Sequence, residues 1–267
     1  MTAKKPLILA IETSGRWGSV ALALGEQLLI EQEFTGPMRH NAELFPAISL
    51  LLRQVNEKPK HIEQIYISAG PGSFTGLRIA VALAKMANFA NDVKIIALDT
   101  LDVIAANVSS FVSDRSVSCK TKLPQRVAVI LDAKRNQFFA AVYRHADGDD
   151  SHKADSGHNR GRCNPLAALD WPLIKITDDC IITAANFVKQ FTHQPEPLWL
   201  LGEGLVYYKN KFVTRGIKFF SGDYWRPRAQ KVHELGWFLA QQGRFADPTA
   251  LRPKYLRRPD VKMNSML

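Results

Sequence analysis

The sequence predicts an α/β protein built from two related lobes, each with a mixed sheet flanked by helices. Residues 7–24 hold an apolar stretch that ends in Glu12, a short turn of small residues and a second apolar stretch. Residues 126–143 repeat this order, with Asp132 in the place of Glu12. A β-branched stretch, a glycine turn and a helical stretch follow one another over residues 65–90. Together these three patterns predict the fold class.

The first segment is expected to form three strands over residues 7–34, because its apolar runs are separated by short turns. Such a meander builds the antiparallel part of a mixed sheet. Glu12 ends the first strand beside Thr13 and Ser14, and these three residues are candidates to hold a magnesium-bound phosphate. In the alternative interpretation, the two hydroxyls only bond to the local backbone and stabilise the turn.

An amphipathic helix is expected over residues 47–55, since apolar side chains recur there at spacings of three and four. Residues 40–46 lead into this helix, with Asn41 as a candidate N-cap. Pro46 has no N–H to donate, so it has to lie in the first turn or kink the helix. A lone histidine at position 40 is better explained as a capping residue than as a metal ligand.

The glycine turn at residues 70–72 separates a strand from a helix that begins at Ser73. Backbone N–H groups and the helix dipole attract anions at such a helix start, so Gly70, Gly72 and Ser73 are candidate phosphate ligands. Alternatively, the glycines only permit a positive φ and Pro71 fixes the bend. No Lys-Ser or Lys-Thr pair follows the second glycine, so the turn is not a Walker loop.

The helix that follows is apolar on nearly every side over residues 77–89. A helix with this pattern is buried on more than one face. Alanines at positions 80, 84 and 87 would let a second helix approach its backbone closely. Either the domain itself covers both faces, or a partner protein covers one of them.

Composition indicates an ordinary soluble globular protein of 267 residues, with 46% hydrophobic and 22% charged residues. No apolar run approaches the roughly 20 residues of a membrane helix, and residues 1–10 do not resemble a signal peptide. We therefore expect a cytoplasmic location and no contact with a membrane. Cys119, Cys163 and Cys180 are widely spaced and predict neither a disulfide framework nor a zinc site.

The net charge of +10 is unevenly distributed. Residues 1–110 hold ten Lys and Arg and ten Asp and Glu, whereas residues 111–267 hold 25 and 15. A basic surface favours polyanions such as tRNA, but a solvated basic face is the simpler explanation, because no interleaving of aromatic and basic residues typical of an RNA module appears. We expect a first lobe over residues 1–107 and a basic second lobe over residues 108–267, with polar inserts near 108–125 and 144–165.

Three segments resemble the TsaB (YeaZ) family: residues 8–14, the helix at 40–52 and, above all, residues 70–78. Further matches follow in the family's order at residues 132–135, 142–143, 202–204 and 253–257. The resemblance implies an actin-like fold of the acetate kinase, sugar kinase, Hsp70 and actin superfamily. It also implies a part in making N6-threonylcarbamoyladenosine at position 37 of tRNA.

In that system a TsaB-like subunit is a non-catalytic dimerisation partner of the TsaD-like transferase, with a TsaE-like ATPase in the full complex. The resemblance implies that the first two helices pair with those of TsaD. The residues expected at this interface are Leu44, Ile48, Leu51, Leu52, Leu77, Ala80, Val81 and Ala84. The same helices would support a homodimer when the partner is absent, and the basic lobe is the candidate for contact with tRNA.

Two enzymatic alternatives stay open. One is a stand-alone ATP-dependent actin-like enzyme that uses Glu12, Thr13, Ser14 and the glycine turn. The other is a glycoprotease-like hydrolase, which no Ser/His/Asp spacing or metal motif supports. No histidine has another four residues later, so the metal pair of TsaD is missing and we expect no catalytic or metal-binding residue. No cofactor is firmly indicated, but ATP or ADP with magnesium is the candidate at or near the partner interface.

Overall fold

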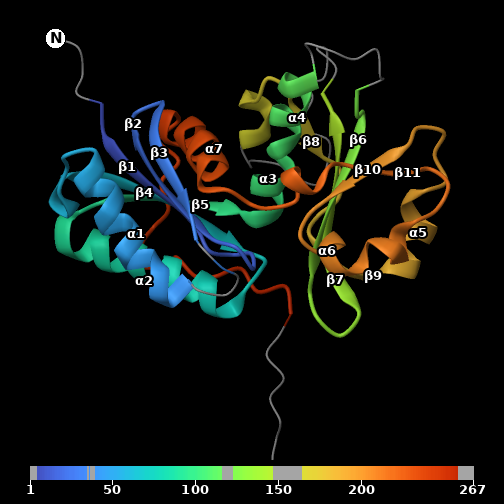
Figure 1. Ribbon diagram of the computed structural model, residues 1–267, viewed down its shortest axis with the longest axis horizontal. Helices are drawn as coiled ribbons and strands as arrows, with labels where there is room; N and C mark the ends of the chain where they lie inside the picture. The colour runs from blue at the N-terminus through green and yellow to red at the C-terminus, as the bar shows by residue number, and fades with distance from the viewer. Residues whose placement is uncertain (1–4, 35, 37–39, 116–122, 147–163, 258–267) are drawn as a thin grey trace, which may run out of the picture.

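The structure, a computed structural model, describes residues 5–34, 36, 40–115, 123–146 and 164–257. Two lobes lie side by side, each built on one mixed sheet with helices on its faces (Figure 1). This arrangement confirms the predicted fold class. The predicted polar inserts lie partly outside the described residues. Within the first of them, residues 107–115 form a helix where a loop or hairpin was expected.

The first sheet has the order β3-β2-β1-β4-β5. Its strands are β1 (Leu7–Glu12), β2 (Ser19–Leu24), β3 (Gln27–Glu33), β4 (Ile62–Gly70) and β5 (Lys94–Asp99). The first three strands are antiparallel, and β4 and β5 run parallel to β1. Alternate residues of β1 face opposite sides of the sheet, so Leu9 and Ile11 lie in one core and Ile8 and Ala10 lie in another.

Helices cover both faces of this sheet. On one face lie α1 (His40–Gln54) and α2 (Phe74–Asn91), and on the other lie α3 (Thr100–Ala105) and α7 (Ala229–Gln241) (Figure 1). Helix α1 begins at His40, one residue before the predicted N-cap Asn41, and Pro46 lies inside it. A short helix, η1 (Pro59–His61), leads into β4.

The second sheet repeats the first in order and direction, since β8-β7-β6-β10-β11 corresponds to β3-β2-β1-β4-β5. Its strands are β6 (Arg126–Asp132), β7 (Gln137–His145), β8 (Leu173–Lys175), β9 (Cys180–Thr183), β10 (Leu198–Leu201) and β11 (Ile217–Phe219). Strand β9 also pairs with β7. The predicted internal repeat is therefore confirmed.

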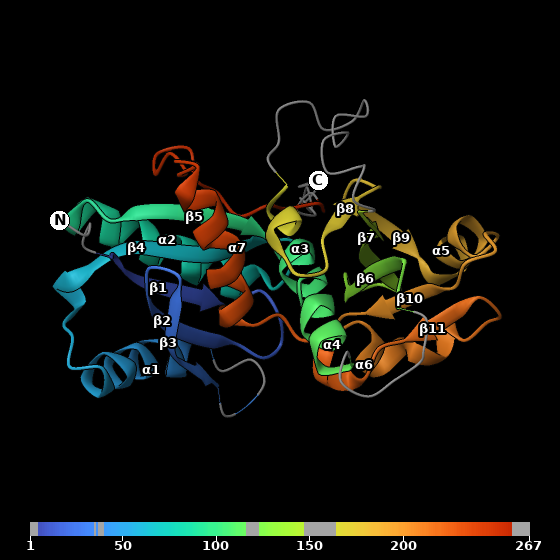
Figure 2. The same ribbon diagram turned by 90° about the horizontal axis from the view of Figure 1, so that it is seen from above.

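Short helices surround the second sheet. They are α4 (Asn107–Arg115), η2 (Pro165–Ala168), α5 (Ala184–Phe191), α6 (Leu205–Tyr208), η3 (Lys209–Phe212) and η4 (Gly222–Tyr224). Phe187 of α5 and Phe212 of η3 pack against one face, while Phe111 of α4 packs against the other. Helices α3 and α4 therefore lie between the two sheets (Figure 2).

Helix α7 returns the chain to the first lobe, where it contacts β1, β2, β4 and β5. Its Gly236 lies against the Tyr66 ring, and a Cβ there would be 2.4 Å from that ring. Further along, Lys254 N donates a 2.7 Å hydrogen bond to Ala69 O. The domain boundary between residues 107 and 108 stays a prediction. Helix α7 and the segment around Lys254 belong to the predicted second lobe but pack on the first.

The side chains predicted to form the partner interface are covered by their own lobe in this structure. All eight side chains are buried inside the first lobe, where α1 and α2 pack on the sheet. They are Leu44, Ile48, Leu51, Leu52, Leu77, Ala80, Val81 and Ala84. Periodicity alone marks an apolar helix face without showing which neighbour covers it. The interface set stays a prediction, and the exposed side chains of these helices lie outside it.

Candidate functional site in the cleft between the lobes

Glu12 lies at the carboxyl end of β1 and is fully buried. Its carboxylate accepts hydrogen bonds from Ser14 N at 2.6 Å, from Ser14 Oγ, and from Ser68 Oγ across the sheet. Burial raises the pKa of the Glu12 carboxyl to about 7, and the hydrogen bonds from Ser14 and Ser68 oppose this effect. The Glu12 carboxylate is therefore hydrogen-bonded within the protein, to Ser14 and Ser68.

Thr13, Gly72 and Ser73 join the glycine turn to the β1–β2 turn, which spans residues 13–18. Thr13 Oγ1 donates to Gly76 O at 2.8 Å, and Ser73 N donates to Ser14 O at 2.7 Å. A Cβ on Gly72 would lie 2.4 Å from Ser14 O. Ser73 Oγ accepts a hydrogen bond from Gly76 N and so caps α2. Polar groups predicted to hold phosphate are bonded to the chain in this structure.

Gly70 lies against the C-terminal segment of the chain. Its φ is +119°, and a Cβ would be 2.7 Å from Lys254 O. The glycine therefore permits a positive φ and a close approach of the C-terminal segment. At this position the structure agrees with the alternative interpretation of the turn.

A cavity of about 480 Å³ opens between the lobes. Its lining residues are Ser14, Gly15, Arg16, Gly72, Ser73, Phe74, Thr75, Leu131, Asp132, Ala133, Lys134, Phe139, Glu203 and Tyr207. Of the six candidate phosphate ligands, Ser14, Gly72 and Ser73 line it, whereas Glu12, Thr13 and Gly70 do not. Both lobes contribute to its walls, and its size is that of a small-molecule site.

Glu203 reaches into this region from the Gly-Glu-Gly turn after β10. It is only 5% exposed, and its Oε2 accepts a 2.7 Å hydrogen bond from Arg16 N of the first lobe. Burial raises the pKa of the Glu203 carboxyl, while the N–H groups of Arg16 and Trp17 oppose the rise. Sequence patterns indicate the turn as an anion or sugar contact, but they do not show its partner 187 residues away.

The rim of the cleft carries charges of both signs. Asp132 accepts hydrogen bonds of 2.8 Å from Lys134 N and Lys134 Nζ, so it caps the β6–β7 turn. Three successive residues of this turn, 134–136, have positive φ values. The guanidinium of Arg16 lies 4.8 Å from the centre of the Tyr207 ring.

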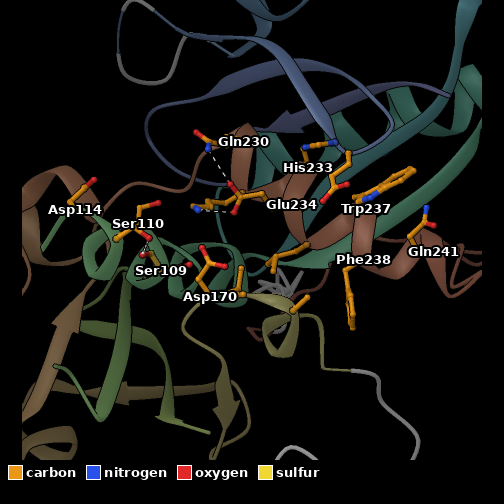
Figure 3. Close-up of a pocket in the computed structure, with 16 residues that line it drawn as sticks. Ser109, Ser110, Asp114, Asp170, Gln230, His233, Glu234, Trp237, Phe238 and Gln241 are labelled. Carbon is orange, nitrogen blue, oxygen red and sulfur yellow. Dashed lines mark hydrogen bonds and ion pairs between the residues drawn. The ribbon is translucent and has the colours of Figure 1, made fainter. Parts of the chain in front are cut away.

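A second cavity of about 580 Å³ lies between α7, α4 and η2 (Figure 3). Asp114, Asp170 and Glu234 are among its lining residues. Lys231 Nζ pairs with Glu234 at 2.7 Å, and His233 Nε2 donates to Gly25 O at 2.8 Å. Lys231 is therefore paired, and the His233 ring is hydrogen-bonded to the chain.

Within the described parts of the chain, no group of three or more His, Cys, Asp or Glu is arranged to hold a metal ion. Among the described helices, none is long and apolar enough to span a membrane.

Fold and cleft define a two-lobed α/β protein of the actin-like class. The family model described as TsaD, tRNA N6-adenosine threonylcarbamoyltransferase, matches residues 37–158. The tRNA threonylcarbamoyladenosine biosynthesis protein TsaB of Bacillus subtilis (strain 168) is 26% identical over 258 residues, or 96% of each chain. That of Buchnera aphidicola (subsp. Acyrthosiphon pisum, strain APS) is 28% identical over 51% of this chain and 57% of its own.

A solved structure, YeaZ from Pseudomonas aeruginosa, has the same fold with a TM-score of 0.68 and 20% identity. The match covers 94% of this chain and 100% of that one. Another from the same organism, described as similar to peptidase YEAZ, reaches a TM-score of 0.71 at equal coverage. The resemblance of this chain to the TsaB (YeaZ) family is confirmed over almost its whole length.

Proposed function

We propose that the chain is a non-catalytic dimerisation or scaffold subunit that binds a TsaD-type transferase. In this role it supports the formation of N6-threonylcarbamoyladenosine at position 37 of tRNA, in the cytoplasm. Support comes from the similarity to TsaB over 96% of the chain and from the match of residues 37–158 to the TsaD family model.

The observation that carries the proposal is the exposed apolar outer face of the α1–α2 layer. Phe45 and Leu50 of α1 are exposed, and Met86 and Phe89 of α2 are 66% and 88% exposed. Large apolar side chains exposed on the same pair of helices make this layer a candidate interaction site. The inner face of the same helices is already buried against the sheet.

A TsaD-type chain is the occupant that the sequence favours for this face. The TsaD family model spans α1 and α2, so a partner of that family would carry helices equivalent to these. An interface of about 1,600 Å² is normal for such a pair. A homodimer through the same face would compete with the partner. The proposed assembly also contains a TsaE-like ATPase. The basic second lobe of this chain contacts the tRNA, and ATP or ADP binds at or near the interface with the partner.

This role is tested by leaving the chain out of a reconstituted modification reaction. Purified transferase, tRNA and the threonylcarbamoyl donor are incubated with and without the chain, and the modified nucleoside is measured by mass spectrometry. We expect product only when the transferase and the chain are both present, and no ATP hydrolysis by the chain alone.

The cavity between the lobes is large enough for a small molecule, so the alternative function is that of a stand-alone ATP-dependent enzyme. Turnover of ATP by the isolated chain would favour that function. Full activity of the transferase without the chain would contradict the scaffold role.

A further inference from the structure

The contact of Glu203 with the β1–β2 turn connects the two lobes through a carboxylate and backbone N–H groups. Its Oε2 accepts from Arg16 N at 2.7 Å, and the N–H of Trp17 also stabilises the carboxylate. We infer that Glu203 is an internal ligand of this turn, which occupies the N–H groups that a nucleotide phosphate would otherwise take. The inference goes beyond the proposed function because it concerns the cleft of this chain, whatever partner it binds.

The β1–β2 turn has the properties of an anion site. Successive backbone N–H groups in a turn form a concave surface that binds carboxylates and phosphates. Here Ser14 N donates to Glu12, and Arg16 N donates to Glu203. Two carboxylates of the chain therefore use donors that would face the phosphates of a bound nucleotide.

Glycines on both sides of the contact allow the carboxylate to enter. A Cβ on Gly15 would lie 2.8 Å from Glu203 Oε2. Gly202 has a φ of +117°, and Cβ atoms on Gly202 and Gly204 would lie 2.4 and 2.8 Å from Ile130 O. The Gly-Glu-Gly turn can therefore pack directly on β6 and direct its carboxylate toward the first lobe.

The residues present do not fit a magnesium nucleotide at this turn. A phosphate would meet the buried Glu203 carboxylate, and the two negative charges would repel each other with little solvent between them. The Ser73 N–H at the start of α2 is also engaged, because it donates to Ser14 O at 2.7 Å. The Glu203 carboxylate thus takes the place of a bound anion in the cleft, and its hydrogen bond to Arg16 N links the two lobes.

Replacement of Glu203 tests the anion site directly. Pyrophosphate and ADP are titrated by calorimetry into the wild-type chain, Glu203→Ala, Glu203→Gln and the exposed control Glu26→Gln. We expect Glu203→Ala to bind pyrophosphate at least about tenfold more tightly than the wild type and the control, with Glu203→Gln between them. Equal affinities of wild type and Glu203→Ala, or no binding by the folded variants, would overturn the inference.

A double-mutant cycle tests the contact without any ligand. Gly15→Ala places a methyl group against the carboxylate, so we expect it to lower the Tm by about 4 °C in the wild type. In the Glu203→Ala background the same change has room, and we expect it to shift the Tm by less than about 1 °C. Equal shifts in the two backgrounds would show that Glu203 does not occupy this turn and would overturn the inference.

Discussion

At the scale of single residues, close backbone approaches determine how the turns around the cleft meet. Ser73 N donates to Ser14 O, and the missing side chain of Gly72 makes room for that approach. The sequence predicts one site for six residues, of which Ser14, Gly72 and Ser73 line the cleft, whereas Glu12, Thr13 and Gly70 do not. The contact of Glu203 could not be predicted, because it depends on how the lobes pack.

Replacing Gly72 with alanine should destabilise the chain strongly. The new Cβ would lie 2.4 Å from the main-chain oxygen of Ser14, which cannot move without opening the turn. We expect a loss of about 3 kcal/mol in the free energy of unfolding, measured with urea. Gly222→Ala is the matched control, since nothing lies within 4 Å of its Cβ, and it should change stability by less than about 0.5 kcal/mol. Similar losses for both variants would contradict the packing described.

The buried Glu12 carboxyl should make stability depend on pH. Its folded-state pKa of about 7 lies above the ordinary value of 4.5, so the folded protein holds the proton more tightly than the unfolded chain. Stability should therefore fall as the pH rises from about 4.5 to about 7, by roughly 3 kcal/mol from this group. Asp99 adds to the same trend, because burial and the neighbouring Asp102 raise its pKa to about 7.

Urea unfolding at several pH values measures this dependence, with Glu12→Gln as the comparison. The variant should lose the part of the decrease between pH 4.5 and 7 that Glu12 causes, since it cannot release the proton, and should keep the part that Asp99 causes. An unchanged slope in Glu12→Gln would show that other groups cause the decrease.

At the scale of elements, the spacing of apolar residues predicts most strands and helices. It does not predict which other elements each of them packs against. The apolar faces of α1 and α2 are evident in the sequence, but the sequence does not show that they pack on the sheet of their own lobe. Helix α4 was missed because serines dominate residues 107–115. Val108, Phe111 and Val112 pack on the core at helical spacing, but they cover a single turn among polar residues, which is too short for a clear period.

Charged substitutions on the outer face of α2 should weaken binding to the TsaD-type partner. Met86→Asp and Phe89→Asp place a carboxylate where the proposed interface excludes water, so we expect at least about a tenfold loss of affinity by calorimetry. Both side chains are exposed in the isolated chain, so its stability should change by less than about 0.5 kcal/mol. Val213→Asp is the matched control, because Val213 is 69% exposed and lies on the second lobe. An equal loss in the control, or none in α2, would contradict the proposed face.

At the scale of the whole molecule, a buried ionic network joins the two lobes. Lys175 Nζ pairs with Asp102 at 2.8 Å and with Asp179 at 2.6 Å, and Lys254 Nζ pairs with Asp99 at 2.5 Å and also with Asp179. Asp99 and Asp102 come from the first half of the chain and the other three groups from the second. Sequence patterns could not show this network, because its members are up to 155 residues apart.

Removal of Lys254 should loosen the attachment of the C-terminal segment. Lys254→Met leaves Asp99 and Asp179 with Lys175 alone. Since the Lys254 side chain is 36% exposed, solvent screens part of the effect, and we expect a loss of about 1–2 kcal/mol in urea unfolding. Lys60→Met, at an exposed position of η1, should have no measurable effect. If the two variants lose the same amount, the network contributes nothing.

The central claim, that this chain is a partner of a TsaD-type transferase, is tested most directly by size-exclusion chromatography with light scattering. The chain is run alone and mixed with the transferase of the same source at micromolar concentration. The account predicts a one-to-one complex, which also replaces any homodimer of the isolated chain. Separate elution of the two proteins, each at its own mass, would contradict it.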